Sequence, residues 1–251
     1  MGRTKSYVVG QSEPFKISRS KMEEHHRCPR CSVLTLKHGL KRQSMVPFNL
    51  NIAVDTLLKN EFDQYREAAT VHPLVADAGL DLVPFAHPDI DIWRDTRNGI
   101  KTVARGFEIM GAVDDVWIDR EGNLVIVDYK ATGKSTPVTE VGRTGFGLSY
   151  RRQLEIYQWL FRQNGFSVSD TAYWVYATAT AQEPSFDSVL RFVTNLIEFQ
   201  GSATWIESEL DAMKADLDAF ALPEPGAECD VCRYYDDRME VESRILFGSA
   251  D

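Results

Sequence analysis

Two acids and a lysine occur in an apolar sequence that predicts a β-hairpin. Asp114 lies in the first arm, residues 111–118, and Asp128 and Lys130 end the second arm, residues 124–130. Because Asp128 and Lys130 are two positions apart, the pleat of a strand places both side chains on one face. Two carboxylates beside an ammonium group indicate a site for a divalent metal ion with a charge-stabilising lysine.

The hairpin that would position these residues is predicted from its composition. Valine and isoleucine dominate both arms, and Glu121-Gly122-Asn123 supplies the residues of a turn. Apolar residues alternate onto both faces of the second arm between Leu124 and Val127, which is typical of a strand covered on both sides. A charged pair at the end of such a strand therefore indicates a function.

This ordered set of residues resembles the PD-(D/E)xK nuclease superfamily, and in particular its RecB-type exonuclease branch. The motifs that carry the resemblance are Gly111 with Asp114, Asp128-Tyr129-Lys130, and the downstream helix motif Gln153-x-x-x-Tyr157. The resemblance covers most of residues 20–235. It implies that Asp114, Asp128 and the Tyr129 backbone carbonyl hold Mg²⁺ or Mn²⁺. It also implies that Lys130 stabilises charge, and that Gln153 and Tyr157 position the site or the DNA backbone.

A further metal ligand is expected from the resemblance on an earlier helix. RecB-type relatives often carry Gly-x-x-x-His there, and the matching frame in this chain ends at Asp55. We expect Asp55 either to replace the histidine as an oxygen ligand or to be an ordinary exposed helix residue. His72 is a weaker substitute and is expected in a loop. Three basic residues are candidate DNA contacts: Arg151, Arg152 and Lys134.

All four cysteines occur in two Cys-x-x-Cys pairs, Cys28/Cys31 and Cys229/Cys232. This spacing predicts a metal site that joins the two ends of the chain; redox motifs or buried thiols are the alternative. Two such pairs are typical of structural zinc. Several RecB-type nucleases instead hold a [4Fe–4S] cluster with one N-terminal and three C-terminal cysteines. We favour the cluster, with Cys31 as fourth ligand, although Arg238 stands where the last cysteine is expected.

The remaining periodicity predicts an α/β fold with a mixed central sheet flanked by helices. The expected helices begin near Ser20 and cover about residues 33–40, 47–66, 151–164 and 205–220; further strands are expected at 171–178 and within 189–199. Residues 1–17 are expected to be a lead-in strand or arm, and residues 70–105 irregular loops on the active-site side. Together with the resemblance, this predicts a single domain over residues 1–251. A restriction-endonuclease-like core spans about 106–200, and an N-terminal helical part spans 18–66.

The composition sets limits on the class of protein. Of the 251 residues, 43% are hydrophobic and 26% are charged, as in an ordinary globular protein. No apolar run approaches a membrane span and the polar start is no signal peptide, so we expect a cytoplasmic protein. The net charge of −9 argues against a broadly basic nucleic-acid coat, but a basic groove of limited extent remains compatible with it.

Three functions are compatible with these features. The first is a Mg²⁺- or Mn²⁺-dependent deoxyribonuclease, exonuclease-like, that serves DNA repair, recombination or phage DNA processing. Its partner would be DNA, single-stranded or with a free end, and a helicase or recombination protein is a candidate second partner. The alternative is a weak or inactive nuclease-fold module that binds nucleic acid within such a complex. The third is a metal-stapled structural protein.

Overall fold

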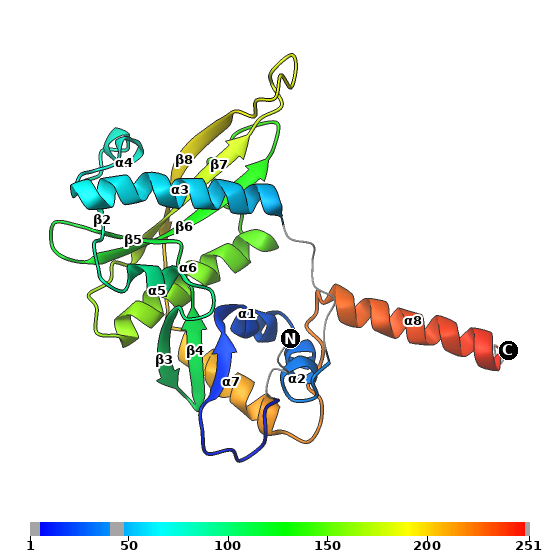
Figure 1. The fold of residues 1–251 in the computed structure, drawn as a ribbon. Helices are drawn as coiled ribbons and strands as arrows, with labels where there is room; N and C mark the ends of the chain where they lie inside the picture. The colour runs from blue at the N-terminus through cyan, green and yellow to red at the C-terminus, as the bar shows by residue number, and fades with distance from the viewer. Residues whose placement is uncertain (1–5, 41–47, 249–251) are drawn as a thin grey trace. The chain divides into compact units, whose positions relative to one another are not determined.

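The computed structural model describes residues 6–40 and 48–248. Its helices and strands follow one another along the chain as Figure 1 shows. In order they are β1 (Phe15–Ser18), α1 (Arg19–Arg27), α2 (Pro29–Leu36), α3 (Asn49–Ala68), α4 (Pro73–Asp77), β2 (Val83–Pro84), α5 (Ile90–Arg94), β3 (Ile100–Ala104), β4 (Phe107–Gly111), β5 (Asp115–Ile118), β6 (Leu124–Gly133), α6 (Phe146–Gln163), β7 (Thr171–Ala179), β8 (Phe192–Gln200), α7 (Ile206–Asp218) and α8 (Asp230–Phe247).

The chain divides into two compact units. The first unit takes Met1–Ser44, Ala104–Phe107 and Glu207–Asp251, and the second takes Met45–Val103 and Glu108–Ile206. The expectation of one domain over the whole chain stays a prediction. The expected start of the third helix at Pro47, and the first five residues of the expected N-terminal arm, lie outside the described residues.

A five-stranded sheet forms the centre of the second unit. Its strand order is β2-β5-β6-β7-β8, with β6 and β7 parallel and the other neighbours antiparallel. Parallel neighbours need a crossover connection, and α6 supplies it because it lies between β6 and β7 in the chain. The predicted mixed sheet with flanking helices is confirmed, and so is the predicted hairpin, in which β5 pairs with β6.

Both faces of β6 are buried, as its composition predicts, and the two faces meet different helices. On one face Val125, Val127 and Tyr129 join a buried cluster with Phe62 of α3 and Trp117 of β5. The next residue along β6, Lys130, points to the other face. There α6 packs, burying one side that contains Leu154, Ile156, Tyr157, Leu160 and Phe161. The end of β6 is thus enclosed by α3 and α6.

The expectation of irregular loops over residues 70–105 is wrong. This stretch contains α4, β2, α5 and β3. These elements are short, with two to five residues each, so none is long enough to show a period. Long-range pairing stabilises them instead, as where Val83 of β2 lies opposite Ile118 of β5.

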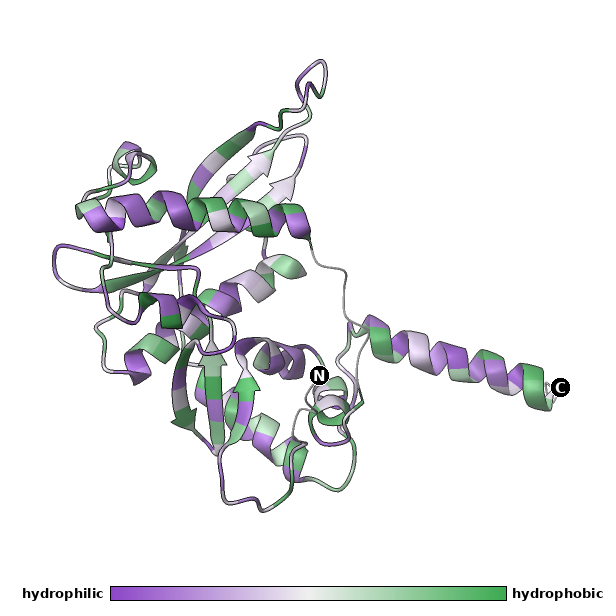
Figure 2. Cartoon of the chain, viewed as in Figure 1, coloured by the Kyte–Doolittle hydropathy of each residue, from purple (hydrophilic) through white to green (hydrophobic). Residues whose placement is uncertain are grey.

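Helices at the two ends of the chain match the expectations in part. Helix α1 begins at Arg19, next to the expected start near Ser20, and the Ser20 hydroxyl bonds the Ser18 hydroxyl. Pro29 begins α2, since the first helical turn tolerates a proline. Helix α8 was not expected, and Cys232 is its buried residue among those described. Figure 2 shows mainly hydrophilic residues between its ends.

A buried histidine links α1 to α7 in the first unit. Both ring nitrogens of His25 lie within hydrogen-bond distance of carboxylates, at 2.5 Å from Glu209 and 3.0 Å from Asp216. Two carboxylate acceptors require two N–H donors, so His25 is an imidazolium ion here. Burial opposes that charge, but the two carboxylates raise the pKa of His25 above 6.5. His25 and His26 in turn lower the pKa of Glu209 to about 2, although burial opposes the effect.

We predict a pH-dependent contribution of this cluster to stability. The raised His25 pKa stabilises the fold fully below about 6.5 and loses the effect as pH rises through the folded-state pKa. The lowered Glu209 pKa stabilises the fold above about 4.5 and loses the effect as pH falls towards about 2. His25→Gln should cost about 2 kcal/mol in urea unfolding at pH 5.5 and much less at pH 9. An equal cost at both pH values would contradict the imidazolium assignment.

Candidate active site and cysteine metal centre

Asp128 is the most deeply buried acid of the predicted set. It lies in the middle of β6, paired with β7 opposite Trp174, and its side chain is fully buried. Neither carboxylate oxygen accepts a hydrogen bond from any described residue. Its charged neighbour is the Lys130 ammonium, with which it forms an ion pair. A buried carboxylate normally has hydrogen-bond donors, so this one is left with lone pairs that a cation could take.

Electrostatics at Asp128 depend on this burial. Burial raises the pKa of Asp128 to about 7, an effect that Lys130 opposes and Asp114 strengthens. Lys130 itself is held above its ordinary pKa, because the attraction of Asp128 and Asp114 exceeds the effect of burial. Its ammonium also lies 4.8 Å from the centre of the Tyr150 ring. The site therefore holds a charged lysine against acids that are costly to ionise together.

Asp114 reaches the same site from the segment between β4 and β5. One of its oxygens accepts a hydrogen bond of 2.9 Å from the backbone N–H of Tyr129. This bond fixes the Asp114 carboxylate against the backbone of β6 at Tyr129, the residue between Asp128 and Lys130. The structure thus brings together Asp114, Asp128 and Lys130, with the Tyr129 backbone in their midst.

Asp55 joins this group from α3. Its carboxylate lies 2.8 Å from the Lys59 ammonium one helical turn later, and the same ammonium lies 3.4 Å from Asp114. Burial and the charge of Asp114 raise the pKa of Asp55, whereas Lys59 opposes the effect. His72 is accounted for elsewhere: it caps α4 and contacts Glu61 at 3.0 Å. Asp55 is therefore the acid that the structure places beside Asp114.

The neighbouring Asp115 has a different environment, which the sequence did not reveal. Its buried carboxylate accepts hydrogen bonds of 2.5 Å from Arg66, 2.9 Å from Arg94 and 2.7 Å from the Tyr129 hydroxyl. These donors, with the indole N–H of Trp117 at 3.2 Å, leave little capacity for a metal ion. Asp115 is a structural acid, and Asp114 is the acid that faces the site.

Helix α6 supplies the predicted glutamine and tyrosine. The Gln153 amide donates a hydrogen bond of 3.2 Å to the Tyr157 hydroxyl, as neighbours four apart on a helix can. Tyr157 is buried and lies close enough to Lys130 to contribute to its raised pKa. The helix packs closely at Gly111, where an added Cβ would lie 2.7 Å from a ring carbon of Tyr157 and 2.8 Å from Leu160. The glycine of the motif thus permits the approach of α6.

The three candidate DNA contacts differ in their surroundings. The Arg151 guanidinium donates to the backbone carbonyls of Val141 and Gly142, at 2.6 and 3.3 Å, and is thus engaged in holding the preceding loop. Arg152 is half-buried on the same helix. Lys134 lines a groove of about 420 Å³ that begins at Ala131, the residue after Lys130. The other lining residues are largely apolar and include Leu50, Val54, Ala179, Leu190 and Phe192.

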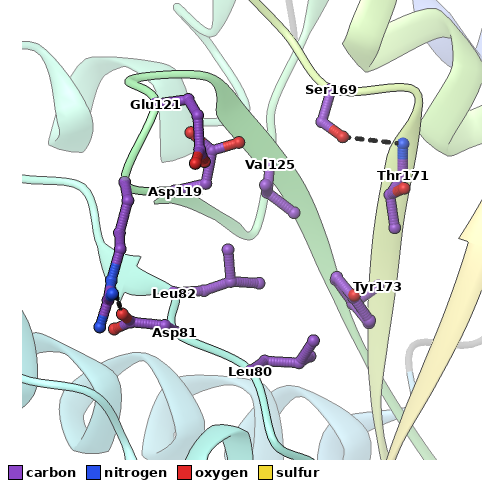
Figure 3. Close-up of a pocket in the computed structure, with 10 residues that line it drawn as sticks. Leu80, Asp81, Leu82, Asp119, Glu121, Val125, Ser169, Thr171 and Tyr173 are labelled. Atoms are coloured by element: carbon purple, nitrogen blue, oxygen red, sulfur yellow. Dashed lines mark hydrogen bonds and ion pairs between the residues drawn. The ribbon is translucent and has the colours of Figure 1, made fainter.

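A second pocket, of about 470 Å³, contains none of the predicted site residues. Figure 3 shows it beside the hairpin turn, near Val125 and Tyr173. Its lining carries three carboxylates, those of Asp81, Asp119 and Glu121, against the single guanidinium of Arg120, which pairs with Asp81. An acidic lining repels phosphates, so this pocket does not suit a nucleic-acid strand, although it is larger than the groove beside Lys130.

The four cysteines come together in the first unit. The Sγ atoms of Cys31 lie 3.6 Å from Cys229 and 3.5 Å from Cys232, and that of Cys28 lies 3.7 Å from Cys232. All four sulfurs lie within 4.8 Å of one another. With metal–sulfur bonds of about 2.3 Å, a tetrahedral site spaces its sulfurs about 3.8 Å apart. The arrangement of the four cysteine sulfurs therefore fits four thiolates around one metal ion.

The backbone prepares one of these thiols for ionisation. Burial disfavours a Cys28 thiolate, but N–H groups of Gly226 and Cys31, at 3.3 and 3.5 Å, lower the pKa of Cys28 to about 7. Burial raises the pKa of Cys232 to about 11, so the four thiols do not ionise together without a cation. Gly226 allows the close approach, since a Cβ there would lie 2.0 Å from the carbonyl oxygen of Arg27.

Comparisons with known proteins were made on the whole chain. Residues 49–236 match the model of the PD-(D/E)XK nuclease superfamily. A crystal structure of a provisionally named exonuclease from Eubacterium rectale is similar at 14% identity, over 88% of each chain, with a TM-score of 0.39. A search of curated proteins gave no match. Among residues 6–40 and 48–248, no helix is long and apolar enough to cross a membrane.

The close approach at Gly111 yields a testable prediction. Gly111→Ala should lower the free energy of unfolding by about 1–3 kcal/mol, because the added methyl group forces α6 away from β4. Urea unfolding followed by tryptophan fluorescence would measure the change. Gly142→Ala is the matched control, because a Cβ at Gly142 meets nothing within 4 Å. Equal stability of the two variants would show that α6 does not depend on Gly111.

Proposed function

The chain belongs to the PD-(D/E)XK nuclease superfamily, and we propose that it is a Mg²⁺- or Mn²⁺-dependent deoxyribonuclease. The observation that carries the proposal is the buried Asp128 carboxylate, whose two oxygens accept no hydrogen bond from the described residues. Oxygen ligands on a rigid strand suit hard divalent cations. Asp114, Asp128 and the Tyr129 carbonyl would hold the ion, and Asp55 is the candidate fourth ligand.

The reaction that fits these residues is phosphodiester hydrolysis. Water attacks phosphorus, one new P–O bond forms, the bond to the leaving sugar oxygen breaks, and that oxygen takes up a proton. The chemistry that a divalent ion supplies when bound is Lewis acidity, which polarises the phosphate and makes water a better nucleophile at neutral pH. Lys130 would orient the water or neutralise the charge that grows on the phosphate oxygens.

Residues around this centre would place the DNA strand. The Gln153–Tyr157 pair borders Lys130 from α6 and would position the scissile phosphate. The groove that begins at Ala131 would take the adjoining nucleotide, because its apolar wall suits a base and Lys134 suits a phosphate. Arg152 would contact the backbone. Arg151, which holds the loop at Val141, would act mainly by keeping that loop in place.

We propose single-stranded DNA, or DNA with a free end, as the substrate and exonuclease-like cleavage as the activity. The groove beside Lys130 supports this choice, because its apolar wall and Lys134 offer a single strand one base contact and one phosphate contact. DNA repair, recombination and phage DNA processing are the settings in which such ends arise. A helicase or recombination protein is the proposed partner, and the cytoplasm is the proposed location.

A second function is favoured by one observation. Lys59 pairs with both Asp55 and Asp114, two of the proposed ligands. If this pairing prevented metal binding, the chain would be a nuclease-fold module that binds DNA without cleaving it. Metal-dependent cleavage distinguishes the two functions directly.

For the four-cysteine site we propose zinc in place of the cluster that the family resemblance favours. Sulfur separations of 3.5–3.7 Å support a single tetrahedral ion. A [4Fe–4S] cluster puts each thiolate on a different iron atom, which needs a wider arrangement of sulfurs. The symmetrical pairs Cys28/Cys31 and Cys229/Cys232 suit zinc as well, since each pair can form one knuckle.

We predict that Asp128→Ala abolishes DNA cleavage and leaves the fold intact. Loss of a metal ligand removes several kcal/mol of transition-state stabilisation, so the rate should fall at least roughly a hundredfold. The fold should persist with reduced stability, because the variant leaves the largely buried Lys130 ammonium without its ion-pair partner. The measurement is cleavage of end-labelled single-stranded, duplex and circular DNA with Mg²⁺ or Mn²⁺, alongside urea unfolding.

Glu121→Gln is the matched control, because Glu121 is an exposed acid in the hairpin turn. It should cleave at the wild-type rate. Cleavage by Asp128→Ala at that rate would refute the active site. Metal-independent binding of DNA by the wild type, without cleavage of any substrate, would favour the binding module instead.

The cysteine site gives a separate prediction. Protein purified without added metal should contain one zinc per chain by elemental analysis and show no absorption band near 400 nm. A strong chelator should lower its melting temperature, because a structural zinc site contributes folding free energy. Cys31→Ser should do the same without a chelator. Iron together with a broad band at roughly 400 nm would identify a cluster instead.

A further inference from the structure

Lys59 is a charged residue of the candidate site that no motif accounts for. Its ammonium lies 2.8 Å from Asp55 and 3.4 Å from Asp114, and its side chain is 23% exposed. Asp55 and Lys59 are four positions apart on α3, so the helical geometry brings their side chains together. Asp114 comes from the distant β4–β5 segment and completes the arrangement.

The Lys59 ammonium occupies the place that a cation bridging Asp55 and Asp114 would occupy. It contacts both carboxylates and neutralises one of their two negative charges. The remaining acid, Asp128, pairs with Lys130, and its oxygens accept no further hydrogen bond from the described residues. The site thus has one acid pair already bridged by a protein cation and one buried carboxylate still open.

The net charge of the site also favours one divalent ion over two. Three carboxylates and two ammonium groups leave one net negative charge when all are ionised. One divalent ion converts this to one positive charge, which suits a phosphate substrate. A second divalent ion would leave three positive charges in a half-buried site, and like charges at such short range are strongly unfavourable.

We propose that Lys59 is a fixed cation at the Asp55–Asp114 pair, which limits the site to a single divalent ion held by Asp128 and Asp114. This rests on the proposed function, since it assumes that the acids bind metal. It assigns Lys59 as a positioning residue: it acts through the acids that it holds. Asp55 is then a partner of Lys59 in this chain and becomes a metal ligand only when Lys59 is removed.

The test counts bound Mn²⁺ by electron paramagnetic resonance, in titrations of the full chain without DNA. The wild type should bind one Mn²⁺, and Asp128→Ala should lose it. Lys59→Met should bind two, with the first at least roughly tenfold tighter, because a unit charge a few ångströms from a divalent ion has that effect even in water. The double variant Lys59→Met/Asp55→Asn should return to one ion, because it removes the ligand that Lys59→Met frees.

Two charge controls accompany these variants. Lys59→Arg keeps the cation and should bind one ion, as the wild type does. Lys101→Met removes an exposed lysine of the second unit that contacts none of these acids and should not change the count. Circular dichroism confirms that each variant is folded before titration.

The outcomes separate this proposal from the function on which it rests. No Asp128-dependent Mn²⁺ in the wild type would overturn the metal site itself. One ion of unchanged affinity in Lys59→Met would overturn the role of Lys59 while leaving the nuclease in place. Two ions in Lys59→Arg or in the double variant, or a tighter site in Lys101→Met, would also overturn that role.

Discussion

Burial of the Asp128 carboxylate in the centre of a sheet is the constraint around which the second unit is built. A charged group there loses its hydration, and only an ion pair with Lys130 offsets the loss. The cost is tolerated because packing on both faces holds β6 in place: α3 covers the face of Tyr129, and α6 covers the face of Lys130. The buried Asp128 carboxylate therefore contributes little to the stability of the fold, but its oxygens are well suited to binding a cation.

Two adjacent aspartates show how the surroundings divide roles between identical side chains. Asp115 is saturated by Arg66, Arg94 and the Tyr129 hydroxyl, and so it ties α3 and α5 to the sheet. Asp114 accepts one backbone hydrogen bond and otherwise faces an ammonium group. Asp115 is held rigidly by these hydrogen bonds, and its rigidity fixes the backbone position of Asp114, the residue before it.

The parts of this structure that follow local rules could be predicted from the sequence. The period of two in a strand placed Asp128 and Lys130 on one face, and the helical period placed Gln153 beside Tyr157. Lys59 was missed, although its spacing of four from Asp55 is a usable signal. Short elements such as β2 and the arginines around Asp115 were missed because contacts between distant segments fix them, and no periodicity encodes such contacts.

The two proposed metal sites of the chain differ in their ligands, and this difference assigns one to structure and the other to catalysis. Four cysteine thiolates are soft ligands that fill every position of a tetrahedral ion, so that site leaves no room for a substrate. Carboxylate and carbonyl oxygens are hard ligands, and the Asp128 site supplies too few of them to complete a shell, because Lys59 engages Asp55. Open positions on the ion are what a phosphate and a water need. Under the proposed function only the incomplete site would therefore be catalytic, and ligand hardness would direct each metal to its own site.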